Sequence, residues 1–369
     1  MQGFVDERFA PVGAVFEQGL ASDAELGASV CITVDGETVV DLWGGHADAA
    51  RTRPWQRDTI LNVYSVTKTM TALTALLVAD RGELDVTAPV SRYWPEFAAA
   101  GKDAVTVAHL LSHSSGLSGW AEPVTVEDLY DWGKVTGLLA AQEPFWAPGT
   151  ASGYHVITQG FLVGEVLRRI TGRSLGTLFR EEVAVPLHAD FHIGLPESEE
   201  PRVAELVAPV GGSTMPFADP TPLQANAAVP DLGVDAANSR AWRAAQIPAG
   251  NGTGNARAVA GVLAVLACGG EAGGRRLLSE AGARRALEVQ VEGTDLVLAM
   301  PVRFGLGFAV GGMMPNPNTL YWGGLGGSIA LADLDARTTF TYVPNRLAGA
   351  GDTRGFGLLM AMWEAQKLI

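Results

Sequence analysis

Cysteine is almost absent from this chain: Cys31 and Cys268 are the only two among 369 residues. So few cysteines cannot build the disulfide framework that stabilises many small secreted proteins. Cys31 falls in an apolar, strand-like run from Ala28 to Val34, so no disulfide is expected there. Cysteine usage therefore favours a reducing compartment, and we expect a cytoplasmic protein.

Long apolar stretches and an excess of positive charge are also lacking. The segment Met1 to Pro11 contains Asp6, Glu7 and Arg8 and no apolar core of a signal peptide, and no later stretch approaches membrane-spanning length. Lys and Arg number 26 against 40 Asp and Glu, which gives a net charge of −14. We therefore expect no membrane segment, no nucleic-acid partner and no binding to anionic membrane surfaces.

Signatures of metal and cofactor binding are missing as well. No His-Glu-x-x-His motif is present, and His109 and His113, four residues apart, have no convincing third ligand. A hydrogen-bonding role is expected for His113 instead. Gly305 and Gly307 have the spacing of a dinucleotide loop, but no helix follows them. The sequence thus predicts no metal and no cofactor.

What the chain does contain is a Ser-x-x-Lys motif formed by Ser65 and Lys68. Of the four lysines, Lys68 alone has a serine three positions upstream. On a helix these positions share a face, so the amine can reach the hydroxyl and take its proton. Ser65 to Ala79 lacks Gly and Pro and is apolar almost all round, which predicts a buried helix. A simple N-cap serine beside a solvated lysine is the alternative, which a buried helix disfavours.

Two later segments offer partners for this pair. Tyr154 follows the turn at Pro148-Gly149 and precedes a helical pattern from Ile157 to Ile170, so a loop presents it at the start of a helix. The run from Tyr321 to Ser328 holds four glycines and precedes a pair of strands. Glycines in such a place mark the close approach of a backbone or a ligand. An exposed backbone N–H there could form half of an oxyanion hole.

Three motifs of this chain resemble, in type and order, those of the serine β-lactamase and penicillin-binding-protein superfamily: Ser65-x-x-Lys68, Tyr154 and Trp322-Gly323-Gly324. The chain most resembles the family VIII carboxylesterases, which are similar to class C β-lactamases, and the resemblance covers nearly its whole length. It implies two-step acyl transfer on Ser65, with Lys68 and Tyr154 as a coupled base and the formal base left open between them. It also implies that Tyr154 protonates the leaving alcohol, and that the backbone N–H groups of Ser65 and Leu325 hold the oxyanion.

Two positions depart from the β-lactamase pattern. Val156 stands where those enzymes have the asparagine of Tyr-x-Asn, and Trp322 stands where they have the lysine of Lys-Thr-Gly. Apolar groups at both places favour neutral substrates, so Val156, Trp322, Gly323 and Gly324 are predicted to bind the substrate. We expect a carboxylesterase for short-chain neutral esters that retains slow β-lactam hydrolysis. A β-lactamase, D-alanyl peptidase or amide hydrolase using the same Ser-Lys-Tyr site is the alternative.

The order of the predicted elements divides the chain into three stretches. A helix, strands and the Ser65 helix occupy residues 1–84, a mainly helical pattern covers 85–296, and strands with a last helix return over 297–369. The resemblance implies that the first and last stretches form one discontinuous α/β (α+β) domain on a central antiparallel sheet flanked by helices. Residues 85–296 would form a mainly helical domain, with the site between the two.

Overall fold

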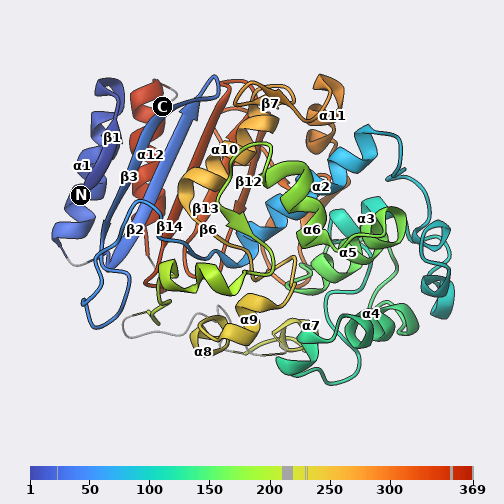
Figure 1. Cartoon of the computed structure of the whole chain (residues 1–369). Coiled ribbons are helices and arrows are strands. Elements are labelled where there is room, and N and C mark those ends of the chain that lie inside the picture. The colour runs from blue at the N-terminus through green and yellow to red at the C-terminus, as the bar shows by residue number, and fades with distance from the viewer. Residues whose placement is uncertain (23, 210–218, 229, 231, 350–351, 368–369) are drawn as a thin grey trace.

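A nine-stranded sheet runs through the structure (Figure 1). The computed structural model describes residues 1–22, 24–209, 219–228, 230, 232–349 and 352–367. The strands lie in the order β1-β3-β2-β14-β13-β12-β11-β10-β9, and every neighbouring pair is antiparallel. Their bounds are β1 Gln2–Val5, β2 Gly27–Val34, β3 Glu37–Gly45, β9 Val291–Thr294, β10 Pro301–Phe304, β11 Ala309–Val310, β12 Thr319–Gly323, β13 Ile329–Asp333 and β14 Thr338–Pro344. The predicted central antiparallel sheet is confirmed.

Side chains that alternate along the strands give the sheet two apolar faces, each covered by helices. On β2, Val30 and Ile32 pack with the helices α1 (Ala10–Ala21) and α12 (Arg354–Gln366). Cys31, between them in sequence, belongs to the core on the opposite face. That second face is covered by α10 (Ala256–Ala267). The sheet is therefore the middle layer of a three-layer arrangement.

The remaining helices lie mostly to the right of the sheet in the view of Figure 1. They are α2 Thr67–Asp80, α3 Val107–Leu111, α4 Trp132–Ala141, α5 Thr158–Thr171, α6 Leu175–Phe179, α7 Pro222–Ala227, α8 Val234–Ala237, α9 Arg240–Ala244 and α11 Glu280–Arg284. The division into residues 1–84 with 297–369 and residues 85–296 stays a prediction. Because α10 packs on the sheet and β9 belongs to it, we propose that the sheet-bearing domain also includes both of these elements.

A small three-stranded sheet, β4-β6-β5, holds the chain just before Ser65. Its strands are β4 Leu61–Asn62, β5 Phe191–His192 and β6 Thr253–Gly254, and a separate hairpin joins β7 Glu271–Ala272 to β8 Arg275–Arg276. The side-chain amide of Asn62 donates to the carbonyl oxygen of Gly250 at 3.0 Å, and the backbone N–H of Val63 donates to that of Gly252 at 2.9 Å. The segment leading into Ser65 is thereby anchored to a part of the chain far away in sequence.

The helix predicted from Ser65 to Ala79 is α2, and its predicted burial is confirmed, because every residue from Thr67 to Ala79 is buried. Its start differs from the prediction: Tyr64–Val66 form a 3-10 turn, and α2 begins at Thr67. The turn starts at Tyr64, whose φ of 46° is left-handed and cannot belong to an α-helix, so the chain enters α2 through one 3-10 turn that takes in Ser65 and Val66. At the other end Gly82 takes a φ of 77° just beyond the helix, as predicted for its C-terminal glycine.

Within the described residues, no helix has both the length and the apolar character that crossing a bilayer requires.

Candidate active site

Ser65 lies on a tight turn between a strand and a helix. The turn follows β4 and leads directly into α2, so the Ser65 hydroxyl sits at the N-terminal end of a fully buried helix. Tyr64, immediately before it, holds a left-handed backbone conformation that costs a non-glycine residue about 1 kcal/mol or more. Such strain persists only where the surroundings fix it, and here the backbone N–H of Tyr64 donates to the Asn62 side chain at 3.2 Å.

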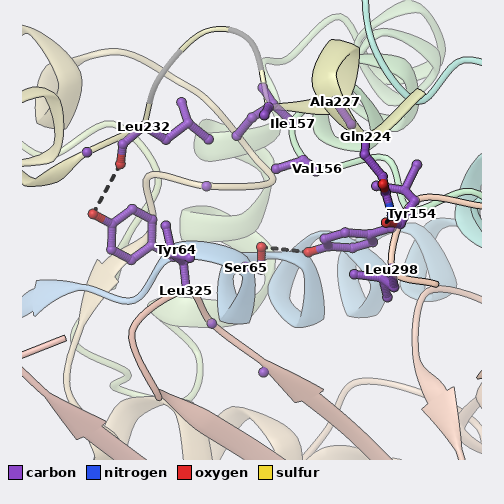
Figure 2. Close-up of a pocket in the computed structure, with 16 residues that line it drawn as sticks. Tyr64, Ser65, Tyr154, Val156, Ile157, Gln224, Ala227, Leu232, Leu298 and Leu325 are labelled. Carbon is purple, nitrogen blue, oxygen red and sulfur yellow. Dashed lines mark hydrogen bonds between the residues drawn. The ribbon is translucent and has the colours of Figure 1, made fainter. Parts of the chain in front are cut away.

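The structure brings together the three predicted catalytic side chains. The Lys68 amine lies 3.1 Å from the Ser65 hydroxyl oxygen, and the Tyr154 hydroxyl lies 2.7 Å from the same atom. Figure 2 shows the Tyr154 ring pointing its hydroxyl at Ser65. The Lys68 nitrogen also lies 4.9 Å from the centre of the Tyr154 ring. Ser65 is therefore hydrogen-bonded on two sides at once.

Lys68 is completely buried, and its other partners are main-chain oxygens. Its amine donates to the carbonyl oxygens of Val156 at 2.7 Å and Ala249 at 2.9 Å. Among the described residues, no carboxylate is paired with it, and burial holds the pKa of the Lys68 amine well below its usual range. A neutral amine has two N–H bonds for the two carbonyls and one lone pair left for Ser65. That lone pair is what a base needs.

Tyr154 has the opposite character and stays protonated. Burial raises the pKa of its phenol to about 12, although hydrogen bonding with the side chains of Ser65 and Trp322 opposes the rise. The negative charge of Asp295 adds to the increase. Tyr154 therefore meets Ser65 as a proton donor, while Lys68 meets it as an acceptor.

Ser65 and Leu325, the two residues whose backbone N–H groups are predicted to bind the oxyanion, both line the cavity. The N–H of Leu325 has no main-chain partner in the loops of the described chain. Gly324 permits this approach: a Cβ atom there would lie 2.5 Å from the Val63 carbonyl oxygen. The close approach predicted from the glycines is thus present between β12 and the segment that carries Ser65.

The cavity has a volume of about 310 Å³ and is mainly apolar (Figure 2). Its lining comprises Tyr64, Ser65, Tyr154, Val156, Ile157, Gln224, Ala227, Ala228, Leu232, Gly233, Gly250, Val297, Leu298, Gly323, Gly324 and Leu325. None of these carries a formal charge. The Tyr64 hydroxyl and the Gln224 amide are both occupied, because they donate to the carbonyl oxygens of Leu232 at 3.3 Å and Val297 at 3.1 Å.

The predicted substrate-binding residues do not all reach this cavity. Val156, Gly323 and Gly324 line it, whereas Trp322 is only 5% exposed and does not. The Trp322 ring instead packs against Phe304 and lies 5.8 Å from the Tyr154 ring, centre to centre. Its contact with the site is therefore through Tyr154.

Several residues around the site were not assigned a part in it from the sequence. Ala249 contributes only a carbonyl oxygen, which no sequence pattern reveals. Asp295 accepts a hydrogen bond from the Tyr154 backbone N–H at 3.0 Å. His113 accepts one from the backbone N–H of His155 at 3.1 Å, which confirms the hydrogen-bonding role expected of it. The sequence signal for a buried, hydrogen-bonded His113 was its position in the run of leucines and serines from Leu110 to Leu117.

A second serine in the chain has the residue pattern of a nucleophile elbow. Gly172 to Gly176 reads Gly-x-Ser-x-Gly, with Ser174 in the middle. An elbow requires a strand before the serine, but here α5 precedes it. Ser174 accepts from the backbone N–H of Thr177 at 3.3 Å and caps α6. This serine has an ordinary structural role at the start of a helix.

Comparisons with known proteins cover every segment that builds the site. A family model described as Beta-lactamase matches residues 12–359. The Esterase/beta-lactamase LipL of Mycobacterium tuberculosis is 36% identical over 375 residues, which cover 94% of this chain and 83% of that protein. A crystal structure of a family VIII carboxylesterase matches with a TM-score of 0.94 and 43% identity, covering 99% of each chain. A penicillin-binding protein homolog from Caulobacter crescentus matches with a TM-score of 0.93 and 39% identity, again covering 99% of each.

Proposed function

The chain belongs to the Beta-lactamase family and is a serine ester hydrolase, and on this premise we propose that it cleaves short, neutral carboxylic esters through an acyl-enzyme on Ser65. One observation carries the proposal. The Ser65 hydroxyl lies between a neutral amine at 3.1 Å and a protonated phenol at 2.7 Å, in a cavity without charged residues. A hydroxyl with an acceptor on one side and a donor on the other is prepared for nucleophilic attack and for protonation of the leaving group.

In acylation, the Ser65 hydroxyl gives its proton to Lys68 as its oxygen bonds to the ester carbonyl carbon. The tetrahedral oxyanion lies between the backbone N–H groups of Ser65 and Leu325. When the carbon–oxygen bond to the alcohol breaks, Tyr154 donates its proton to the departing oxygen, and the Lys68 ammonium returns a proton to the phenolate. The alcohol thus carries the proton of Tyr154, and Tyr154 receives, through Lys68, the proton that left Ser65, so both groups regain their starting states.

In deacylation, water takes the place of the alcohol and the proton transfers run in reverse. Tyr154 passes its proton to Lys68 and takes one from water as the water oxygen attacks the acyl carbon, and the Lys68 ammonium then protonates the departing Ser65 oxygen. The products are the free acid and the resting enzyme. No metal or cofactor enters either half of the reaction.

The choice of neutral esters rests on the lining of the cavity. A β-lactam or a D-alanyl peptide brings a carboxylate, which needs a charged partner or hydrogen-bond donors. Val156 presents an isopropyl group to the cavity, and the Trp322 indole lies behind Tyr154, so neither offers a cation. A neutral ester leaves no buried charge unpaired.

The second candidate is hydrolysis of β-lactams or amides at the same Ser-Lys-Tyr site. It is favoured by the names of two relatives, an Esterase/beta-lactamase and a penicillin-binding protein homolog. Because Ser65, Lys68, Tyr154 and the two backbone donors serve any acyl transfer, we propose slow β-lactam hydrolysis as a side activity of the ester hydrolase.

One side-by-side assay tests the proposal. Purified protein is given p-nitrophenyl acetate, p-nitrophenyl butyrate, a chromogenic cephalosporin and a D-alanyl amide, and kcat/KM is compared across the set. We expect the esters to exceed the others by at least about ten-fold, and Ser65→Ala to abolish all four activities. A wild-type protein that hydrolyses the cephalosporin or the amide as fast as the esters would overturn the preference for neutral esters.

We also propose a cytoplasmic location. Both cysteines are free thiols in the structure, Cys31 buried and Cys268 half-buried, which fits a reducing compartment. Localisation of a tagged full-length protein by cell fractionation tests this, and recovery outside the cytoplasm would contradict it.

A further inference from the structure

Tyr154 lies in an irregular segment, yet its hydroxyl must stay within hydrogen-bond distance of Ser65. Residues 151–155 form no helix or strand, so no regular ladder of hydrogen bonds holds them. A catalytic group displaced by about 1 Å can lose about 10²-fold in rate. Something else must therefore fix the backbone at Tyr154.

Successive backbone N–H groups of this segment are taken up by two residues from distant parts of the chain. The N–H of Gly153 donates to the carbonyl oxygen of His113 at 2.9 Å. The N–H of Tyr154 donates to the carboxylate of Asp295 at 3.0 Å, and the N–H of His155 donates to His113 Nδ1 at 3.1 Å. The peptide groups on both sides of the Tyr154 Cα are thus held by side chains.

Both acceptors are buried polar side chains of which one atom accepts hydrogen bonds and the other has no partner among the described residues. His113 is fully buried and Asp295 is 1% exposed. Because Nδ1 of His113 accepts a hydrogen bond, the ring proton is on Nε2, and that atom has no hydrogen-bond partner within the described residues. The second carboxylate oxygen of Asp295 likewise has none among them. Buried polar groups left half-satisfied are uncommon and call for an explanation.

The backbone conformation and the neighbours of His113 also indicate a role in holding Tyr154. Its φ of 61° is left-handed, a conformation uncommon for residues other than glycine but adopted by histidine, asparagine and aspartate more often than by most. Its ring lies 5.0 Å from the Tyr154 ring and stacks on Trp322 at 5.4 Å, centre to centre. Burial, with the nearby His155 and Lys68, holds the pKa of His113 well below its usual range, so Nδ1 keeps its lone pair.

Asp295 connects Tyr154 to the wall of the cavity. The carboxylate oxygen that accepts from the Tyr154 N–H also accepts from the N–H groups of Val297 at 2.9 Å and Leu298 at 2.8 Å. Val297 and Leu298 both line the cavity, and Figure 2 shows Leu298 beside Tyr154. One carboxylate oxygen of Asp295 thereby links the backbone of Tyr154 to two residues of the cavity wall.

We propose that His113 and Asp295 are positioning residues, which clamp the backbone of Tyr154 so that its hydroxyl stays aligned with Ser65 and the leaving oxygen. The proposal rests on the proposed function, because it assigns the clamp to the proton donor of that mechanism. Neither residue touches the substrate, and each acts through Tyr154.

The test compares variants that keep the acceptor with variants that delete it. His113→Asn and Asp295→Asn retain a carbonyl oxygen near the position of Nδ1 or the carboxylate oxygen, and asparagine tolerates the left-handed backbone at position 113. His113→Gly and Asp295→Ala remove the acceptor, and glycine still permits the φ. Each variant is measured for kcat/KM on ethyl butyrate and p-nitrophenyl butyrate, and its Tm is recorded.

We expect the deletion variants to lose about 10²-fold on ethyl butyrate and clearly less on the p-nitrophenyl ester, whose leaving group needs little protonation. The Asn variants should recover most of that loss. In a Tyr154→Phe background, deleting either acceptor should cost less than about two-fold more, because no hydroxyl remains to position. A merely structural role would lower Tm and slow both esters alike.

The outcomes distinguish a failure of the positioning role of His113 and Asp295 from a failure of the proton-donor role of Tyr154. If Tyr154→Phe alone retains full activity on ethyl butyrate, the proton-donor role of Tyr154 fails and the clamp fails with it. If Tyr154→Phe is impaired but deleting the acceptors costs the same in both backgrounds, or the Asn variants are as slow as the deletions, the clamp alone is wrong.

Discussion

Lys68 and Lys102 are both completely buried, yet only one of them lies beside a nucleophile. Lys102 donates to the carbonyl oxygens of Ala99 at 2.8 Å and Gln142, and its amine lies 5.3 Å from the centre of the Phe97 ring. Gln142 ends α4, where a cation or N–H donor satisfies free carbonyls. Burial lowers the pKa of Lys102 as well, but less far than that of Lys68, and the negative charge of Glu143 opposes the effect.

The difference between the two lysines lies in the third neighbour. Each amine has two carbonyl acceptors, but Lys68 also meets the Ser65 hydroxyl at 3.1 Å. A buried amine with a lowered pKa is therefore not catalytic by itself. It becomes a base where its remaining lone pair faces a hydroxyl in a cavity that a substrate can enter.

Removing the hydroxyl that distinguishes the two lysines should have the largest effect. Ser65→Ala is expected to lower kcat by about 10⁴-fold or more on every ester, with little change in Tm. An organophosphonate should add one label to the wild-type protein, mapped by mass spectrometry to the peptide containing Ser65. Ser174, in its Gly-x-Ser-x-Gly sequence, is the built-in control, and a label on Ser174 would disprove the assignment.

Replacing each lysine by methionine should separate activity from stability most clearly. Lys68→Met is expected to lower kcat by about 10³- to 10⁴-fold, because the proton acceptor is gone. Tyr154→Phe should cost a comparable factor, and the double variant should be scarcely slower than the worse single one, as for groups that act as a unit. Losses that multiply in the double variant would show that Lys68 and Tyr154 work independently.

The pH dependence of kcat/KM tests whether Lys68 acts as a neutral amine. Since the pKa of Lys68 is held well below its usual range, kcat/KM should fall only on acidification, as the amine becomes an ammonium that cannot accept the Ser65 proton. Tyr154, with its pKa raised to about 12, should remain protonated and add no alkaline limb in the usual assay range. Activity that instead rises through the ordinary lysine pKa near 10.4 would contradict a neutral Lys68.

The proposed oxyanion donors, the backbone N–H groups of Ser65 and Leu325, lie at the cavity beside Lys68 and not beside Lys102. Leu325→Pro removes one backbone N–H and should lower kcat by about 10²- to 10³-fold. Leu325→Ala keeps the N–H and trims only the side chain in the cavity, so it should retain most of the activity. Equal losses in the two variants, with unchanged Tm, would show that the N–H of Leu325 does not bind the oxyanion.

A smaller effect is expected where a cation is introduced near Lys68. Trp322→Lys should reduce the ratio of kcat/KM for esters to kcat/KM for carboxylate-bearing β-lactams by about ten-fold. The reason is that a charge-assisted hydrogen bond to the carboxylate contributes about 1.5–3 kcal/mol. It should also slow the esters, because Trp322 packs against Tyr154 and lowers its pKa by hydrogen bonding. Phenylalanine at the same position is the control, and an unchanged ratio in Trp322→Lys would exclude this position from substrate choice.

The smallest effect on activity belongs to the other lysine. Lys102→Met leaves the carbonyl oxygens of Ala99 and Gln142 without their donor, which should reduce the free energy of unfolding by about 1–3 kcal/mol. kcat per folded molecule should stay unchanged. Denaturant unfolding and esterase assays on one preparation check both, and a lost kcat at full stability would mean that Lys102 belongs to the site.

The parts of the site predicted from sequence are those whose chemistry depends on residue type and local spacing. Ser65 and Lys68 lie three residues apart, so a helix brings them together without help from the rest of the fold. Gly324 was recognisable because the absence of a side chain marks a close approach, here to the Val63 carbonyl. The buried helix likewise follows from a local pattern, whereas the central antiparallel sheet was expected from the resemblance to the family.

The parts that could not be predicted depend on long-range packing or on the backbone. Any residue can supply the carbonyl oxygen that Ala249 offers Lys68, so its identity carries no signal. The left-handed backbone of Tyr64 is set by its surroundings and not by its own preference. Trp322 was placed in the motif correctly, but whether its ring faces the cavity or Tyr154 depends on how β12 packs.

The strand order of the sheet also affects how the chain folds during translation. β2 pairs with β14, and Thr33 and Thr339, 306 residues apart, share a hydrogen bond at 2.7 Å. During translation the Ser65 segment leaves the ribosome long before Leu325, and one edge of β2 waits unpaired for the last strand. A nascent chain therefore carries Ser65 without Leu325, its proposed oxyanion donor, and has an open strand edge that can pair with other chains. A chain truncated before β14 would have neither a closed sheet nor, under the proposed mechanism, a functional site.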